Sequence, residues 1–299
     1  MTETSALPLI ELLEPTRGML LRRRMLGHKG LIVSVTLLAA IVLVALLAPV
    51  LSPHDPYAQD LGRRLIPPIW YPKGNWAHVL GTDNLGRDYL SRVLYGARIS
   101  LLIGVSVMVI SGLIGTTLGL VAGYFGGRTD AVVMFVTTVR LAMPLILVAL
   151  AVVATIGGSL AVVVLVLGLL KWDRFAVVMR AATQQVRGLD YVAAAQCVGA
   201  SALRVVLGEI LPNVLPQLIV VATIEAASAI LLEAALSFLG LGVQPPLPSW
   251  GLMIAEAKSY MFFSFWLIAI PGTALALLVL AINMLGDAIR DVAAPGGRG

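Results

Sequence analysis

The chain has 299 residues, of which 59% are hydrophobic and only 12% are charged. A soluble domain carries about 25% charged residues because its surface needs them. The composition therefore excludes a water-soluble globular enzyme and favours an integral membrane protein. The formal net charge is +5. Because the basic residues lie mostly between apolar runs, we interpret them as determinants of membrane topology and expect no nucleic-acid partner.

Cysteine and histidine are scarce in this sequence. The single cysteine, Cys197, excludes an internal disulfide and a thiolate metal cluster. The three histidines, His28, His54 and His78, do not lie at ligand spacing along the chain. We therefore expect no metal site.

Apolar runs predict six transmembrane helices, each about 20 residues or longer, the length that crosses a bilayer. Residues 1–29 form an N-terminal tail, the first helix covers residues 30–52, and an outer loop covers residues 53–98. Residues 99–290 hold the other five helices, and residues 291–299 form a C-terminal tail.

The apolar run 131–170 contains forty residues, too many for one helix and enough for two. Glycine interrupts helices, so we place a tight outer turn at Gly157, Gly158 and Ser159. This turn separates the third predicted helix from the fourth.

Basic residues indicate the orientation. With six helices and both ends in the cytoplasm, thirteen of the 21 basic residues lie inside, seven lie outside, and Arg140 lies within a span. The positive-inside rule favours this arrangement. With five helices, the segment after residue 170 would face outward with five or more basic residues. We therefore predict an all-α integral membrane protein with six transmembrane helices and cytoplasmic N- and C-termini.

The second half of the outer loop, residues 83–97, has apolar residues at helical spacing. Leu85, Tyr89 and Val93 share one face, whereas Arg87 and Arg92 point elsewhere. This pattern predicts an amphipathic helix on the outer membrane surface that leads into the second span.

Three glycines in the second span recur every four residues: Gly115, Gly119 and Gly123. Small residues at this spacing allow helix backbones to approach closely in lipid. The pattern predicts a helix-packing face. It does not distinguish a partner helix of the same chain from one of another subunit.

The inner segment at about 181–213 reads as a short helix, a break at Gly199, a second helix and a stop at Pro212. Such a segment offers a rigid surface to a cytoplasmic partner. The chain has no Gly-Lys pair and hence no phosphate-binding loop, and it contains none of the common hydrolase or metalloprotease motifs. We expect no catalytic residues.

This inner segment resembles the "EAA" coupling loop of ABC importer permeases. The residues that match the loop or stand within it are Ala194, Ala195, Gly199, Ala200, Ile210, Leu211 and Pro212. Ala193 stands where that pattern usually has glutamate. The resemblance implies that the loop docks onto an ATPase, and the departure at Ala193 removes one carboxylate from the docking contact.

Four further blocks resemble permeases of the dipeptide/oligopeptide/nickel family, namely residues 80–100, 233–242, 246–251 and 283–291. The family implies a type I ABC importer permease in the bacterial inner membrane. Its implied partners are the lipid bilayer, a second homologous permease, two cytoplasmic ATPases and an extracytoplasmic binding protein. The resemblance implies ATP and Mg²⁺ on the ATPases and no cofactor on this chain.

The substrate and transport class stay open at this point. Dipeptides, oligopeptides, glutathione and chelated nickel all fit the family. A self-sufficient secondary transporter usually shows an inverted repeat and midplane carboxylates, and no clear repeat is visible. A membrane scaffold without a transport role is a further alternative.

Two charges within spans lie at similar predicted depths. Arg140 is nine residues into the third span and Glu225 eleven residues into the fifth, both counted from the inner side. Ionisable residues at the bilayer centre need a partner or water. We expect the two residues to face the bundle interior and attract each other, directly or through water. Three alternatives stay open: a structural pair or a contact to the partner permease, a peptide-carboxylate contact in the pathway, and coincidence of depth.

Overall fold

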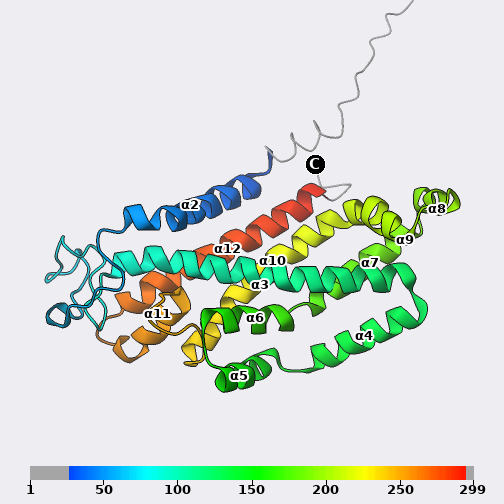
Figure 1. The fold of residues 1–299 in the computed structure, drawn as a ribbon. Helices are drawn as coiled ribbons and strands as arrows, with labels where there is room; N and C mark the ends of the chain where they lie inside the picture. The colour runs from blue at the N-terminus through cyan, green and yellow to red at the C-terminus, as the bar shows by residue number, and fades with distance from the viewer. Residues whose placement is uncertain (1–26, 294–299) are drawn as a thin grey trace, which may run out of the picture.

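The structure is a computed structural model, and it describes residues 27–293. Most of the predicted N-terminal tail, residues 1–29, and the end of the predicted C-terminal tail, residues 291–299, lie outside the described part. Figure 1 shows an elongated helical bundle. The helices are α2 (Lys29–Leu51), α3 (Tyr89–Phe125), α4 (Gly127–Ala142), α5 (Leu145–Ile156), α6 (Leu160–Leu170), α7 (Asp173–Arg187), α8 (Asp190–Cys197), α9 (Ala202–Arg204), α10 (Leu211–Phe238), α11 (Trp250–Ala257) and α12 (Trp266–Ala293).

Short elements complete the described chain. A π-helix, Val205–Ile210, joins α9 to α10, and 3-10 turns cover Leu61–Arg63 and Lys258–Tyr260. Among residues 27–293 the only β-type pairings are two isolated bridges in the loop after α2. We call the end formed by residues 53–88 and α11 the loop end, and the opposite end, which carries α8 and α9, the α8 end (Figure 1).

The long helix α3 runs through the bundle from the loop end to the α8 end and packs against α2, α6, α7 and α10. Its 37 residues give a length of about 55 Å at 1.5 Å per residue. The expected amphipathic surface helix at residues 83–97 is therefore wrong. Residues 83–88 are a tight loop, Asp88 caps the helix at Ser91, and the chain continues without a break into the span.

Four described helices have the length and apolar composition to cross a membrane: Lys29–Leu51, Tyr89–Phe125, Ala202–Phe238 and Trp266–Val292. The pair α4 and α5 qualifies as a fifth span only if it is counted as one, and it bends by 80° at its break. The six long helices expected from the sequence are thus not all present. The fourth predicted helix corresponds to α6, which has only 11 residues.

Local sequence accounts for the breaks between α4 and α6. Pro144 precedes α5, where its missing N–H separates α4 from α5. At the next turn Gly157 adopts φ +106°, and the Ser159 hydroxyl accepts a hydrogen bond from Val162 N. The predicted turn at Gly157, Gly158 and Ser159 is confirmed.

The two ends of the described chain lie together. His28 Nε2, just before α2, is 3.5 Å from Asp291 Oδ2 near the end of α12. Figure 1 shows these ends on the side of the bundle toward the α8 end. Residues 27 and 293 therefore belong to the same side of the bundle.

Candidate functional site

The turn between α8 and α9 is a well-formed helix C-cap followed by a new helix start. Gly199 has φ +86°, its N–H donates to the Gln196 carbonyl, and Ala200 N donates to the Ala195 carbonyl. These two bonds form a Schellman motif, in which the left-handed position favours glycine. Ser201 then caps α9 by accepting a hydrogen bond from Arg204 N. The predicted helix–glycine–helix arrangement is present.

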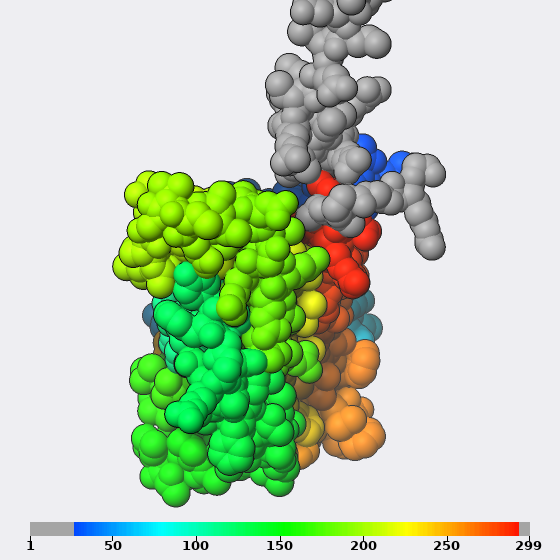
Figure 2. All heavy atoms as spheres, turned by 90° about the vertical axis from the view of Figure 1, so that its right-hand side faces the viewer, coloured from blue at the N-terminus to red at the C-terminus, as the bar shows by residue number. Residues whose placement is uncertain are grey.

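The segment from α8 to α9 (residues 190–204, the α8–α9 segment) projects from the bundle. Figure 2 shows it as the yellow-green surface turned toward the viewer. Its apolar side chains are open to solvent: Val198 is 89% exposed and Leu203 70% exposed. Ala193, Ala194 and Gly199 are also exposed. An uncovered apolar surface of this kind indicates an interaction site.

The base of this segment is anchored in the bundle. Val192, Val205 and Ile210 are fully buried in one apolar cluster with Leu120 of α3 and Met179 of α7. Because closely packed interiors transmit strain, this anchoring connects the α8–α9 segment mechanically to α3 and α7.

The expected helix stop at Pro212 is wrong. Pro212 lies in the first turn of α10, directly after the π-helix, and the helix continues through it. Proline is tolerated in a first turn because its missing N–H has no partner to lose there. Leu211 and Pro212, which the resemblance placed at the end of the loop, therefore begin a long helix, whereas Ile210 is buried at its base.

The glycine face of α3 packs against α7 of the same chain. A Cβ at Gly115 would lie 2.2 Å from the Trp172 carbonyl oxygen, and one at Gly123 would lie 2.6 Å from Thr183 Cβ. Gly119 meets Ala176 in the same way. The contacts advance in step along both helices, so α3 and α7 run parallel.

The structure does not join Arg140 to Glu225 in a direct ion pair. Glu225 Oε2 lies 2.6 Å from Lys171 Nζ, and Glu225 Oε1 lies 3.4 Å from Arg174 Nη1. Arg140 Nη2 instead donates to the Leu170 carbonyl. Sequence reasoning missed Lys171 because it follows an apolar run and was placed in the cytoplasmic segment, whereas its side chain is buried beside the middle of α10.

A cavity of about 740 Å³ adjoins this charge cluster. Its walls come mainly from α7 and α10, with Leu141 from α4 and Arg290 from α12. Arg174 and Glu225 both line it, whereas Arg140 does not. A largely apolar cavity of this size with a few convergent charges has the character of a small-solute site.

A second cluster of charged side chains lies at the loop end. Asp83 Oδ2 accepts a hydrogen bond from Arg87 Nε at 2.6 Å and one from Arg92 Nη1. Both arginines also reach Glu256 of α11, with Arg92 Nη1 2.8 Å from Glu256 Oε2. Asp83, Arg87 and Arg92 are buried. The four-residue spacing of Asp83 and Arg87 could have suggested an ion pair, but nothing in the sequence pointed to Glu256 on α11 as the further partner.

Comparisons with known proteins agree on one family. The family pattern described as binding-protein-dependent transport system inner membrane component matches residues 115–298. The pattern of the N-terminal TM domain of oligopeptide transport permease C matches residues 16–68.

Individual relatives cover most of the chain. It is 43% identical to the di/tripeptide transport system permease protein DppC of Pseudomonas aeruginosa, over 90% of this chain and 88% of that protein. It is 41% identical to the dipeptide transport system permease protein DppC of Escherichia coli, over 90% of this chain and 89% of that protein.

The fold is similar to a chain of the MetNI methionine ABC transporter in an inward-facing conformation. The TM-score is 0.55 at 18% identity, over 68% of this chain and 97% of that chain. Together, the matched family pattern, the relatives that align with 90% of the chain and the apolar helices show that the chain belongs to the family of inner membrane components of binding-protein-dependent transport systems.

Proposed function

We propose that the chain is one of two permease subunits of an ATP-driven importer of peptides or related small solutes. The relatives named as dipeptide and di/tripeptide permeases support the substrate class. In this proposal the chain is non-catalytic and needs no cofactor of its own for transport, and two cytoplasmic ATPases hold ATP and Mg²⁺. A separate extracytoplasmic protein delivers the substrate.

The α8–α9 segment is the proposed docking site for one ATPase. The observation that carries the proposal is the combination of exposed Val198 and Leu203 with a base buried against α3 and α7. An ATPase that closes on ATP would displace this segment, and the buried base would move α3, α7 and α10 as a unit. The alanine at position 193 makes the proposed contact mainly apolar.

The cavity beside Arg174 and Glu225 is the proposed half of the translocation pathway, completed by the second permease. The Arg174 side chain is 63% exposed, whereas that of Glu225 is 1% exposed. Arg174 can therefore turn toward a solute while Glu225 stays paired with Lys171. Arg174 takes the role that the sequence suggested for Arg140, as the cation that meets a peptide carboxylate.

The α8 end is proposed to face the cytoplasm, with both chain ends on that side. The contact between His28 and Asp291 supports a common side for the ends. Lys171 is buried in the bundle and Arg87 and Arg92 in the loop-end cluster, so none of the three counts as a topology signal. The remaining basic residues still favour the α8 end. In this arrangement α6 and α7, which both pack on α3, together cross the membrane once. They are the fourth of six crossings in chain order.

Uptake measurements test the transport proposal. The full complex, reconstituted in liposomes with its binding protein, should import a labelled dipeptide only with ATP. Replacement of the phosphate-binding lysine in the ATPases should abolish uptake. Uptake that survives this replacement and follows an ion gradient would show a secondary transporter and overturn the proposal.

Thiol labelling tests the orientation. Cys197 is exposed in α8, so a membrane-impermeant maleimide should label it in inverted vesicles and not in intact cells. Asn75→Cys in a Cys197→Ser background should show the reverse pattern. Labelling of Cys197 from outside intact cells would overturn the orientation.

A further inference from the structure

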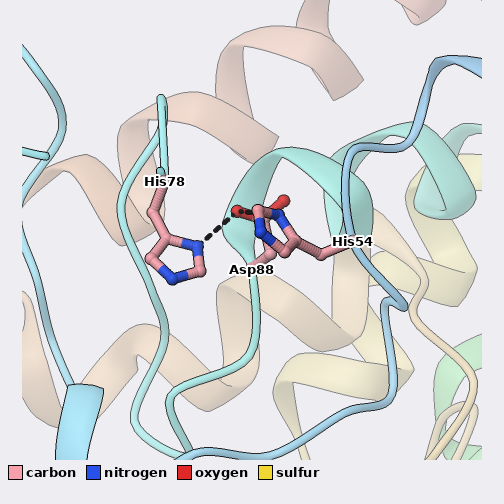
Figure 3. Close-up of side chains that lie close together, drawn as sticks. All are labelled: His54, His78 and Asp88. Atoms are coloured by element: carbon pink, nitrogen blue, oxygen red, sulfur yellow. Dashed lines mark hydrogen bonds and ion pairs between the residues drawn. The ribbon is translucent and has the colours of Figure 1, made fainter. Parts of the chain in front are cut away.

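Three side chains from separate segments converge at the loop end, beside the start of α3 (Figure 3). His54 follows α2, His78 lies in the loop, and Asp88 caps α3. One ligand atom from each lies within 4.8 Å of the others. His78 Nδ1 is 2.8 Å from Asp88 Oδ1, and His54 Nδ1 is 3.6 Å from the same oxygen.

The surrounding hydrogen bonds hold these groups in place. Asp88 Oδ2 accepts from Ser91 N at 2.9 Å and from Ser91 Oγ at 2.7 Å. This leaves Oδ1 directed at the two imidazoles. Ser91 Oγ also accepts from His54 N at 3.2 Å, and His78 N donates to the Asn75 carbonyl at 3.0 Å. Supporting bonds of this kind orient metal ligands.

The charge of Asp88 is only partly compensated. Its side chain is 1% exposed, and its ion-pair neighbours within the described residues are His54 and His78 alone. Asp83, five residues earlier and also buried, has two arginine partners. A buried carboxylate needs a compensating positive charge. The N-terminus of α3 supplies part of it, and neutral imidazoles supply none.

We infer that His54, His78 and Asp88 bind a zinc ion, with water in the fourth position. Zn–N and Zn–O bonds of about 2.0–2.2 Å in tetrahedral geometry separate neighbouring ligand atoms by roughly 3.3 Å. Two of the three separations, 2.8 and 3.6 Å, lie on either side of this value, and all three ligand atoms lie within 4.8 Å of one another. The His54 side chain is 42% exposed, which leaves room for the water and for access of the ion.

The site would tie the end of α2 and the loop to the start of α3. Sequence spacing predicted no metal site because His54 and His78 are 24 positions apart. The fold removes that separation. The site lies outside the proposed pathway cavity, so its test is independent of transport.

Zinc titration of the purified full-length chain tests this inference. The chain is isolated through a histidine-free tag, stripped with chelator, and titrated with ZnCl₂ at pH 7.5 by calorimetry, with bound zinc counted by mass spectrometry. Wild type and the control His28→Ala should each bind one zinc per chain. His54→Ala should bind at least about tenfold more weakly, because loss of a ligand exceeds the loss of a supporting bond.

His54→Ala is the main variant because the His54 side chain is 42% exposed and contacts only Asp88 and the His78 ring within the cluster, so we expect the fold to survive its removal. His78→Ala should show the same loss. At the same zinc concentration, zinc should raise the thermal midpoint of wild type more than that of His54→Ala. Equal zinc binding by wild type and both variants would overturn the inference. The inference would also be overturned if the thermal midpoint of wild type rose on acidification to pH 5.5 but not on addition of zinc. In that case protonated histidine would supply the positive charge that compensates Asp88.

Discussion

The loop end buries a network of charged side chains, whereas the α8 end exposes apolar side chains on a segment that projects from the bundle. The loop end also exposes apolar side chains, such as Trp76 at 81%, so the buried charge network is what distinguishes it. At the loop end Asp83, Arg87 and Arg92 are between 1% and 3% exposed and connect the start of α3 to α11. At the α8 end Val198 and Leu203 are exposed. Figure 1 places the two regions at opposite ends of the same long helix, α3.

This difference suggests different roles: the loop end stabilises the bundle, and the α8 end couples it to a partner. A buried charge network holds its helices in one arrangement, because displacement of any member leaves the others without a partner. Exposed apolar side chains add little to folding and gain free energy only when a partner covers them. Substitutions at the loop end should therefore reduce stability, and substitutions at the α8 end should reduce coupling to a partner.

The largest loss of stability is expected for Asp83→Ala. It leaves Arg87 and Arg92 buried with only Glu256 between them. Breaking a buried charge cluster in this way costs about 3–5 kcal/mol. The measurement is thermal unfolding of the purified chain in detergent. Asp60→Ala is the control, since exposed Asp60 pairs with Arg63 and accepts a hydrogen bond from Gly62 N. A surface pair and a cap of this kind contribute about 1 kcal/mol each. Equal midpoints for the two variants would contradict the comparison.

A smaller loss is expected for Glu225→Ala, which leaves Lys171 unpaired in the bundle while Arg174 can turn to the cavity. Arg140→Ala should reduce the thermal midpoint less than Glu225→Ala, because it removes only a hydrogen bond to a backbone carbonyl. The exchange Lys171→Glu with Glu225→Lys should recover part of the thermal midpoint. Recovery by Arg140→Glu with Glu225→Arg instead would show that the pair expected from the sequence is the real one.

The next loss is expected for Gly115→Ala, because its new Cβ would lie 2.2 Å from the Trp172 carbonyl oxygen and force α7 away from α3. Overpacking of this kind costs about 1–3 kcal/mol. Gly208→Ala is the control, since a Cβ there meets nothing within 4 Å. An unchanged thermal midpoint for Gly115→Ala would contradict the tight contact of α3 with α7.

These positions show which features the sequence could predict. The apolar runs at residues 31–51 and 214–240 agree with α2 and α10 to within three residues, whereas the run at 261–286 differs from α12 by five and seven residues at its ends. Such runs can be read from the sequence because length and apolar composition are local properties. The left-handed turn at Gly199 was visible for the same reason. The start of α3 and the buried position of Lys171 could not be predicted. A charged residue is assigned to a water-exposed segment unless its ion-pair partner is known.

Those partners are distant in the sequence. Arg92 and Glu256 are 164 positions apart, and no local pattern joins them. The predicted number of long transmembrane helices was wrong for a similar reason. Pro144 and the turn at residues 157–159 divide the region after α3 into short helices, and no local pattern shows how these helices pack against α3.

The smallest effect on stability and the strongest on coupling are expected for Gly199→Asp. At φ +86° a residue with a side chain costs about 1–2 kcal/mol in the left-handed region, and aspartate is among those that tolerate it best. A Cβ at Gly199 meets nothing within 4 Å, so the bundle itself is undisturbed. The new carboxylate would stand among exposed apolar side chains that the ATPase is proposed to cover, where an unpaired charge is costly to bury.

Gly127→Asp provides the matched control. Gly127 also has a positive φ, +53°, and a Cβ there also meets nothing within 4 Å, but it lies at the turn between α3 and α4 rather than in the α8–α9 segment. Both variants should insert and show thermal midpoints close to wild type. In the reconstituted complex only Gly199→Asp should abolish dipeptide uptake and the substrate-stimulated part of ATP hydrolysis. Wild-type uptake by Gly199→Asp, or equal loss in both variants, would remove the α8–α9 segment as the coupling site, because backbone strain alone would then account for the data.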